Sequence, residues 1–458
     1  MKQRKLLSFL LVLVIVCSFL WLPVSAAETD LQLQCGNAVL LSRETADVLY
    51  DHNAYDSAYP ASMTKVMTAL LTLEALDAGT VTESTLVTVS DYAAQKDFAD
   101  ESTANLQSGE QMSVLDLLYC LMLPSANDAA KALAEHLGGT AEAFAQMMNR
   151  RAEELGCRNT HFVNPNGLHD PDHYTCAYDI ALMFREAMNY DLFNTIIATA
   201  EYTTAPTNLC AERYFFNTNG LISNYYYSGH VYDKCIGGKT GFTSQAGRCL
   251  VAAAKDGDTV LISVVMGAGP ITGADGSERL GQFDESTRLL EYGFLNFHSV
   301  TLSLPEEPFT QIPVTMSEDG DTLDLIPRGS VTRVLHNDIH QSDMQTRITL
   351  TEDAVQAPVE EGQVLGHVTF SYDGQDYAQL ELVAQRSMEY SQKLERQQAR
   401  QLFMQTTGKK ILLGFALLLL LPVLILVSVR FVNIRRRKRR RKKRAAKGGR
   451  YAKSGKKR

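Results

Sequence analysis

The sequence lacks the features that mark several classes of protein. Its 458 residues include only 8 cysteines, none of them in a CxxC pair, so a small fold held together by disulfides is excluded. With 21% charged and 8% aromatic residues, the chain is neither wholly disordered nor collagen-like. No internal repeat is visible. The 45% of hydrophobic residues are enough for two or three domains, each with its own core.

Acidic residues are missing from both ends of the chain. All 52 aspartates and glutamates lie between residues 28 and 395, whereas residues 435–444 are basic without interruption. The formal net charge of −8 therefore hides a strongly acidic middle part. Since an acidic surface repels phosphates, we expect no nucleic-acid partner. The basic tail could bind DNA, but a signal that stops membrane translocation accounts for it fully.

The N-terminus has the pattern of a secretory signal peptide. Three basic residues precede an apolar run at 6–22, and the small residues Val24-Ser25-Ala26 follow. We therefore predict a signal peptide over residues 1–26, cleaved after Ala26, and export of the remainder. A retained N-terminal membrane anchor is the alternative.

A second apolar run lies near the C-terminus, at residues 411–429, interrupted only by Ser428. As a helix at about 1.5 Å per residue it is about 30 Å long, which is the thickness of a bilayer core. The basic tail at 432–458 follows directly. The positive-inside rule predicts a protein that crosses the cell membrane once, with this tail in the cytoplasm and residues 27–410 outside.

Between these two ends the hydrophobic periodicity is first helical and then strand-like. It predicts a hairpin at 38–50 and a series of later elements: helices at 60–79, 114–123, 128–137, 141–155 and 177–189, strands at 235–241, 248–254 and 259–267, and a helix at 276–296. This order predicts an α+β domain over residues 27–297, with an antiparallel sheet and a helical subdomain.

The composition changes near residue 297. Residues 299–383 contain no convincing helix, and prolines and glycines separate short alternating runs. We therefore predict a small all-β domain at 298–384, a polar stalk at 385–410, the transmembrane helix at 411–431 and the tail at 432–458.

Ser62 and Lys65 form a Ser-x-x-Lys pair at the start of the first long helix. Positions i and i+3 share a helix face, so the lysine amine can reach the serine hydroxyl. A serine needs an adjacent base to become a nucleophile, and a lysine can be that base only if its pKa is lowered. The pair alone is weak evidence, because Ser454 and Lys457 repeat the spacing in the basic tail.

Two further motifs carry polar groups. Ser125 and Asn127 lie at a break between two helices, where a loop can point both side chains into a cleft; in isolation, helix capping explains them better. Lys239, Thr240 and Gly241 end a predicted strand. They suit a peptide with a free carboxylate that docks as an extra strand, and the alternative is a solvated lysine at a strand end.

Together, the order and contexts of the three motifs resemble those of the low-molecular-weight penicillin-binding proteins that are D-alanyl-D-alanine carboxypeptidases. The resemblance is strong over residues 31–296 and looser over the β-domain. It rests on four stretches: Tyr59-Pro60-Ala61-Ser62-Met63-Thr64-Lys65, Leu123-Pro124-Ser125-Ala126-Asn127-Asp128-Ala129, Phe162-Val163-Asn164-Pro165-Asn166-Gly167-Leu168 and Gly238-Lys239-Thr240-Gly241-Phe242-Thr243. It implies a β-lactamase/DD-peptidase-like fold for the first domain.

The resemblance also implies catalytic roles for particular residues. Ser62 would be the acylated nucleophile, Lys65 its general base, and Ser125 the relay that returns the proton to the leaving D-alanine. The backbone N–H groups of Ser62 and Phe242 would form the oxyanion hole. Some relatives carry histidine at the position of Phe242, so a role for that side chain is in doubt.

Substrate binding would fall to the other motif residues. Asn127 would hold the substrate backbone and Lys65. Lys239 would bind the terminal carboxylate, with help from Thr240 and Gly241.

The implied function is penicillin-sensitive removal of the terminal D-alanine from peptidoglycan stem pentapeptides, through an acyl-enzyme, in cell-wall biogenesis. Stem peptides ending in D-Ala-D-Ala and the membrane would be the partners, and β-lactams covalent inhibitors. A β-lactamase is one alternative, but the Glu-x-x-Leu-Asn stretch that class A enzymes use to activate water is absent from that part of the chain. A penicillin-binding sensor with slow turnover is another.

Two remaining groups of residues could bind a metal or form a disulfide. His161, His169 and His173, with two nearby aspartates, lack the HExxH spacing and flank a turn sequence, so we expect no metal and no other cofactor. Cys235 and Cys249 flank the predicted hairpin and could pair across it.

Overall fold

The computed structural model describes residues 31–272, 276, 278–303 and 307–451, with side chains up to residue 444. The predicted signal peptide lies outside these residues. The described chain divides into two compact units. The first runs to Leu302 and includes Thr332–Met344, and the second contains Ser303–Val331 and the chain from Gln345 onward.

A five-stranded antiparallel sheet forms the centre of the first unit. Its strands follow the order β2 (Val48–His52), β1 (Asn37–Ser42), β9 (Thr259–Ala268), β8 (Gly247–Asp256) and β7 (Cys235–Thr243). Strands from the two ends of the unit thus pair in its middle, and β7 is left as an edge strand.

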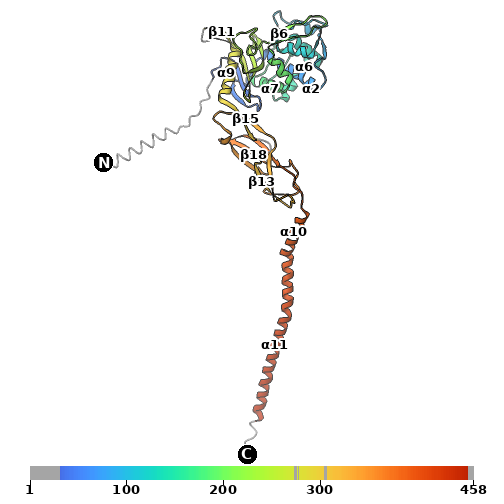
Figure 1. Cartoon of the computed structure of the whole chain (residues 1–458), viewed down its shortest axis with the longest axis vertical. Helices are drawn as coiled ribbons and strands as arrows, with labels where there is room; N and C mark the ends of the chain where they lie inside the picture. Colours follow the sequence, from blue (N-terminus) through green and yellow to red (C-terminus); the bar gives the residue numbers. More distant parts are fainter. Residues whose placement is uncertain (1–30, 273–275, 277, 304–306, 452–458) are drawn as a thin grey trace, which may run out of the picture. The chain divides into compact units, whose positions relative to one another are not determined.

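Each face of this sheet is covered by helices. Because successive strand residues point to opposite faces, Val39 and Leu41 pack with one set of helices, whereas Leu40 packs with α9 (Gly281–Asn296). Figure 1 shows α9 on one side of the sheet and α2, α6 and α7 on the other. The predicted α+β domain with an antiparallel sheet is confirmed.

The helices of this unit include the predicted ones, each within a few residues of its expected position, and two short ones, α3 (Asp91–Ala94) and α8 (Asp191–Ala198), that the periodicity does not predict. In chain order these helices are η1 (Ala61–Thr64), α2 (Lys65–Asp77), α3, α4 (Val114–Met122), α5 (Asn127–Gly138), α6 (Ala141–Glu154), α7 (Ala177–Ala187) and α8. Three short ribbons accompany them: β3 (Leu86–Thr88) with β4 (Gln111–Ser113), β5 (Glu201–Thr203) with β6 (Tyr214–Phe216), and β10 (Pro270–Thr272) with β11 (Glu278–Leu280).

Two helix starts differ from the prediction. The first long helix opens with the tight 3-10 turn η1, and its α-helical part begins only at Lys65. The last helix of this unit begins at Gly281 rather than near residue 276, because β11 pairs with β10 just before it.

The all-β domain predicted after residue 297 is confirmed. Its six-stranded sheet contains β16 (Gln345–Leu350), β18 (Val364–Tyr372), β19 (Gln375–Ala384), β14 (Thr322–Pro327), β13 (Thr310–Thr315) and β17 (Val355–Gln356), in that order. A separate ribbon pairs β12 (Phe297–Ser303) with β15 (Val331–His336), and η2 (Gln341–Asp343) is a short 3-10 turn. Nearly all of this ribbon and all of η2 belong to the first unit. The start of the predicted stalk still belongs to these strands, because Met388 and Tyr390 form bridges to Val359 and Ser317.

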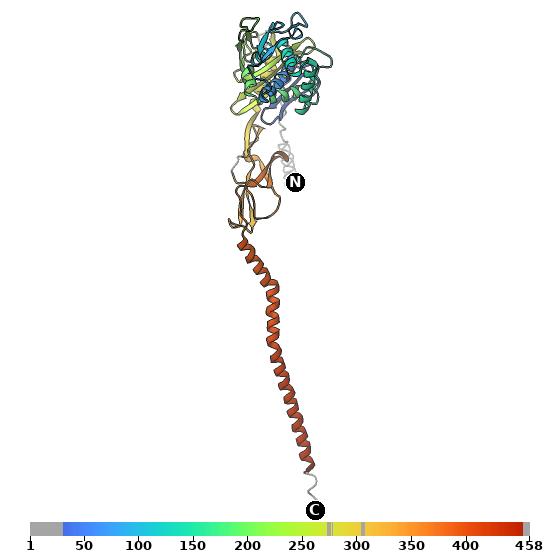
Figure 2. The same cartoon turned by 90° about the vertical axis from the view of Figure 1, so that its right-hand side faces the viewer.

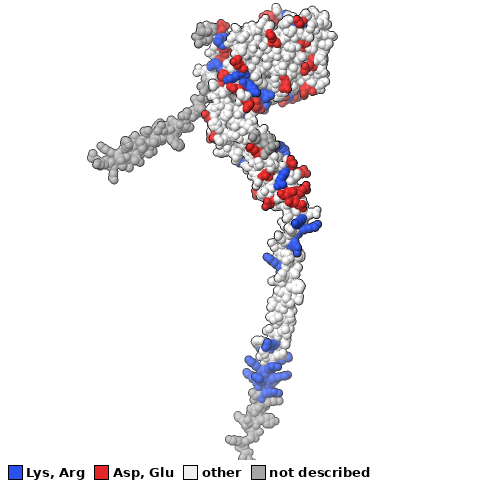
Figure 3. All heavy atoms as spheres, in the orientation of Figure 1, with Lys and Arg blue, Asp and Glu red and all other residues white. Residues whose placement is uncertain are grey.

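A long helix follows, made of α10 (Gln392–Phe403), a π-helical turn (Met404–Gly408) and α11 (Lys409–Tyr451). Figure 2 shows it as one continuous rod. In the part of the chain that the structure describes, it is the one helix long and apolar enough to cross a membrane, judged by length and composition. In Figure 3 its apolar stretch is white, and basic side chains crowd the segment that follows.

The described cysteines are all free thiols. Cys235 lies opposite Ala254 in the β7–β8 register, and Cys249 lies opposite Gly241. The two cysteines are therefore at opposite ends of the hairpin, and the suggested disulfide between them is wrong. Cys120 is fully buried in the core.

Candidate active site

The turn that carries Ser62 is held by a chain of buried hydrogen bonds. Ala61 has a positive φ of 46°, and its carbonyl accepts a hydrogen bond of 2.9 Å from Thr64 Oγ1. His173 Nδ1 accepts from the N–H of Val163, so the ring proton sits on Nε2, 2.9 Å from Thr64 Oγ1. Burial lowers the pKa of His173 to about 4, which keeps the ring neutral. This histidine thus supports the turn.

Lys65 lies beneath Ser62 and is fully buried. Its Nζ is 3.0 Å from Ser62 Oγ, 2.8 Å from Asn127 Oδ1 and 2.7 Å from the carbonyl oxygen of Asn166. The two amide oxygens can only accept hydrogen bonds. In a neutral lysine they therefore take both N–H groups, and the nitrogen lone pair is left facing the Ser62 hydroxyl.

The charge state of Lys65 is shifted toward the neutral amine. Burial lowers its pKa well below the usual value, and the positive charge of Lys239 lowers it further. The carboxylates of Asp128 and Glu101 act in the opposite direction. A buried lysine whose pKa is lowered in this way meets the condition for a general base.

Asn127 links Lys65 to an acidic residue that no motif indicates. Its Nδ2 donates a 2.9 Å hydrogen bond to Glu101 Oε2, and its own Oδ1 faces Lys65. Because a carboxylate accepts only, this contact fixes which end of the amide points at the lysine. Asp128 anchors the loop that carries Glu101, because its carboxylate accepts hydrogen bonds from the N–H groups of Ala104 and Leu106.

Ser125 and Asn127 do not cap a helix. The residue at the N-cap of α5 is Ala126, with no side-chain cap, and Ser125 has a positive φ of 64°. The capping interpretation of this motif is therefore wrong.

Lys239 forms the second half of the site. It is 1% exposed, so the alternative of a solvated lysine is wrong. Its Nζ donates to Ser125 Oγ and to the carbonyl of Thr240, both at 2.9 Å. Burial lowers its pKa to about 7. The Thr240 hydroxyl lies 2.7 Å from Thr218 Oγ1, which the sequence analysis did not single out.

Two glycines allow the segments to approach the Ser62 turn. A Cβ on Gly241 would lie 3.2 Å from the backbone nitrogen of Ser62, so strand β7 passes directly beside the nucleophile. A Cβ on Gly167 would lie 1.9 Å from the carbonyl oxygen of Ala61, at a positive φ of 84°. Glycine at 167 thus allows the loop to come close enough for the Asn166 carbonyl to accept a hydrogen bond from Lys65. Phe242 is 62% exposed, with its ring over Arg248.

The structure brings six of the eight predicted site residues into two hydrogen-bonded groups, and the other two, Gly241 and Phe242, follow Thr240 on strand β7. One group joins Ser62, Lys65 and Asn127, and the other group joins Ser125, Lys239 and Thr240. Sequence reasoning missed Asn166 because it contributes a backbone carbonyl. It missed Glu101 and Thr218 because both lie in segments without a recognisable pattern. In the described residues, no cluster of histidine, cysteine and acidic side chains could hold a metal ion.

Comparison with known proteins identifies the family. Residues 24–269 match the D-alanyl-D-alanine carboxypeptidase family. The chain belongs to this family. Residues 297–390 match a second family, described as penicillin-binding protein 5, C-terminal domain. The carboxypeptidase family consists of serine peptidases, so the chain is a hydrolase of cell-wall metabolism, and its fold is that of penicillin-binding protein 5.

Individual relatives are similar over most of their length. D-alanyl-D-alanine carboxypeptidase DacF of Bacillus subtilis (strain 168) is 33% identical over 393 residues, which are 84% of this chain and 95% of the relative. DacC of Escherichia coli (strain K12) is 32% identical, over 81% of this chain and 89% of the relative. The crystal structure of penicillin binding protein 5 from Haemophilus influenzae has a TM-score of 0.65 and 30% identity, over 78% of this chain and 98% of that one.

Proposed function

We propose that this carboxypeptidase removes the terminal D-alanine from peptidoglycan stem pentapeptides through an acyl-enzyme on Ser62. One observation carries the assignment. The buried Lys65 Nζ contacts two amide oxygens and lies 3.0 Å from the Ser62 hydroxyl. In the neutral amine the two amide oxygens take both N–H groups, so the lone pair faces that hydroxyl. A serine and a base in this arrangement form an activated nucleophile.

In the proposed acylation, Ser62 Oγ bonds to the carbonyl carbon of the penultimate D-alanine while Lys65 takes the hydroxyl proton. The backbone N–H groups of Ser62 and Phe242 stabilise the oxyanion. The C–N bond to the last D-alanine then breaks, and the proton returns through Ser125 to the departing nitrogen. Water hydrolyses the Ser62 ester and frees the enzyme. A β-lactam would acylate the same serine.

Substrate binding is proposed for the Lys239 group. Lys239 Nζ has two acceptors, Ser125 Oγ and the Thr240 carbonyl, and an ammonium carries a third N–H that can bind the terminal carboxylate. The arriving carboxylate also favours the protonated lysine, which burial alone leaves with a pKa of about 7. Thr240, Gly241 and Asn127 would bind the peptide on either side.

We also propose a role for each segment of the chain. Residues 1–26 would direct export, 27–297 would be the catalytic domain, 298–384 the β-domain and 385–410 a stalk. Residues 411–431 would anchor the enzyme in the cell membrane, with the tail 432–458 in the cytoplasm. The apolar helix and the basic segment after it support this topology.

One experiment tests the activity. The full-length protein in detergent is incubated with a peptide ending in D-Ala-D-Ala, with and without penicillin and with and without EDTA. We expect release of D-alanine that penicillin blocks and EDTA does not. Rapid hydrolysis of penicillin itself would favour a β-lactamase, and penicillin binding without D-alanine release would favour a sensor.

A further inference from the structure

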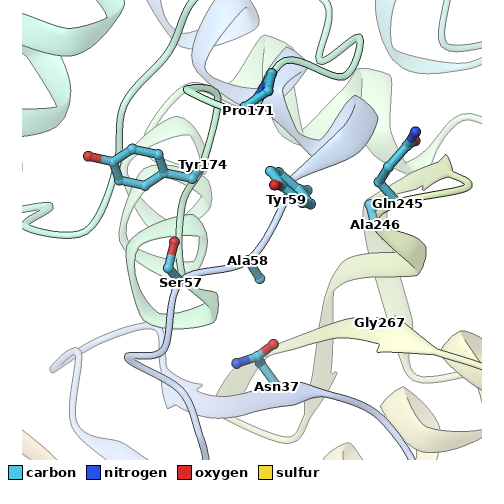
Figure 4. Close-up of a pocket in the computed structure, with 9 residues that line it drawn as sticks. All are labelled: Asn37, Ser57, Ala58, Tyr59, Pro171, Tyr174, Gln245, Ala246 and Gly267. Atoms are coloured by element: carbon cyan, nitrogen blue, oxygen red, sulfur yellow. The ribbon is translucent and has the colours of Figure 1, made fainter.

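A cavity of about 390 Å³ lies beside the Ser62 turn, and none of its lining residues belongs to the two hydrogen-bonded groups of the site. Its walls come from four parts of the first unit: the ends of β1 and β9, the segment before the Ser62 turn, the loop after Gly167, and the turn between β7 and β8. The lining residues are Asn37, Ser57, Ala58, Tyr59, Pro171, Tyr174, Gln245, Ala246 and Gly267. In Figure 4, Tyr174 and Gln245 lie on opposite sides of the view, and Tyr59 lies between them.

The cavity lies further along strand β7 than the catalytic groups. Lys239 and Gly241 precede Thr243 on this strand, and Gln245 and Ala246 form the turn directly after it. At about 3.3 Å per residue, Thr243 is roughly 7 Å beyond Gly241. On the facing side, Tyr59 is three residues before Ser62. The cavity is therefore reached by moving along β7, away from Lys239 and past Ser62.

The proposed function gives the substrate a direction along the same strand, and the inference rests on it. With the terminal carboxylate at Lys239 and the scissile carbonyl at the N–H of Phe242, the preceding part of the peptide continues toward the β7–β8 turn. Consecutive Cα atoms are 3.8 Å apart, so the Cα of the residue before the D-Ala-D-Ala pair lies one such step beyond the penultimate D-alanine, about 5 Å from the scissile carbonyl. Its side chain is the first part of the substrate that can enter the cavity.

The residues of the described chain that line the cavity are uncharged. The tyrosine rings and Pro171 offer apolar surface, and the amides offer hydrogen bonds. Asn37 donates its Nδ2 to the Asn53 carbonyl, and Gln245 Oε1 accepts from Ser244. Asn37 Oδ1 and Gln245 Nε2 are thus an acceptor and a donor that a ligand can use. An ionised group would gain no countercharge from these side chains.

We infer that this cavity is a specificity subsite for the side chain of the residue before the D-Ala-D-Ala pair, and that it favours a long, uncharged, amide-bearing side chain. A side chain of this kind covers the tyrosine rings with its methylene groups and exchanges hydrogen bonds with Asn37 and Gln245. A carboxylate or an ammonium at the same position binds less well.

A peptide series tests the subsite with the full-length enzyme. Nα-acetylated tripeptides X-D-Ala-D-Ala are compared, with X as Nε-acetyl-lysine, lysine, glutamate or alanine. We expect kcat/KM for the Nε-acetyl-lysine peptide to exceed that for the alanine peptide roughly tenfold, the size of effect that a side-chain pocket provides. The lysine and glutamate peptides should fall below the Nε-acetyl-lysine peptide, with glutamate lowest.

Two variants change the cavity in opposite ways. Tyr174→Ala removes part of its wall, and Ser57→Trp fills it from an exposed position. Both variants should lower kcat/KM for the Nε-acetyl-lysine peptide to that for the alanine peptide. They should leave kcat/KM for the alanine peptide within twofold of the wild-type value. Tyr214→Ala is the matched control, because Tyr214 is an exposed tyrosine outside the cavity; it should keep the preference.

The outcomes separate the subsite from the activity. Hydrolysis of all four peptides at similar rates would overturn the subsite and leave the proposed function standing. A preference that survives in both cavity variants would do the same. Failure to release D-alanine from any of the peptides would overturn the proposed function, and the subsite with it.

Discussion

The two halves of the active site each contain a buried lysine, and the difference between them lies in their acceptors. Lys65 is surrounded by a hydroxyl and two amide oxygens, one from a side chain and one from the backbone. Lys239 faces a hydroxyl and a single carbonyl. Burial lowers the pKa of both lysines.

This contrast shows how neighbouring atoms give one residue type two roles. Around Lys65 the acceptors use up the N–H groups and direct the lone pair at Ser62, as a base requires. Around Lys239 an N–H is left for an incoming anion. Both lysines are desolvated, so desolvation does not distinguish their roles. The arrangement of hydrogen-bond acceptors around each lysine does.

The largest effect is expected from removing the nucleophile, because both halves of the site act on the bond that Ser62 attacks. Ser62→Ala should abolish D-alanine release and covalent labelling by penicillin, because, among the residues that the structure describes, no other hydroxyl lies against a lysine that also contacts two amide oxygens. Labelling with a fluorescent penicillin, followed by peptide mapping, measures this. Labelling that persists at Ser125 would show that the two halves are wrongly assigned.

Replacing each lysine by arginine tests the contrast directly. An arginine keeps the charge but cannot act as a base at neutral pH, so Lys65→Arg should slow acylation by roughly 10²- to 10⁴-fold. Lys239→Arg should retain much more activity, since an anion needs only the charge. Stopped-flow acylation by a chromogenic β-lactam compares the two. Similar losses in both variants would remove the distinction between a base and an anion binder.

The carboxylate contact is expected to have an intermediate effect. Lys239→Ala should lower kcat/KM for a D-Ala-D-Ala peptide roughly ten- to a hundredfold, the worth of a charge-assisted hydrogen bond. The same peptide with a C-terminal amide should be a poor substrate for both proteins and lose little more in the variant. The two substrates and two proteins form a double-mutant cycle. Equal losses on acid and amide would assign Lys239 another role.

The smallest expected effect is electrostatic. It shifts the pH dependence of acylation, and the direction of the shift depends on whether a positive or a negative charge is removed. Acylation needs neutral Lys65, so its rate falls as the pH drops through the Lys65 pKa. Four charged or titratable groups face this lysine: Lys239, Asp128, Glu101 and His173. Lys239→Ala removes a positive charge, raises the Lys65 pKa and should move the acidic limb of the pH profile to higher pH.

Glu101→Gln should move the same limb to lower pH, because it removes a negative charge that raises the Lys65 pKa. It should also lower the plateau several-fold, since glutamine no longer fixes the orientation of the Asn127 amide. Asp100→Asn is the matched control in the same loop, at an exposed position, and should leave both limb and plateau unchanged. A Glu101→Gln profile that superimposes on that of the control would rule out this role for Glu101.

Much of the fold follows from periodicity and local chemistry. The pattern of apolar residues predicts the strands of the first sheet, the all-β character of the second domain and most of the helices, because burial of one face is a local property of the sequence. The motif order is likewise enough to select the family. The register of β7 and β8 is different: it depends on where two distant segments meet, and it is what separates Cys235 from Cys249.

The arrangement around Lys65 is decided by the tertiary structure. A motif of side chains predicts Ser62, Lys65 and Asn127, but the third group on the lysine is the Asn166 carbonyl, which any residue at that position would possess. The orientation of Asn127 depends on Glu101, in a loop held by Asp128. Backbone acceptors and loop positions leave no pattern in a sequence, because they arise only when segments a hundred residues apart pack together.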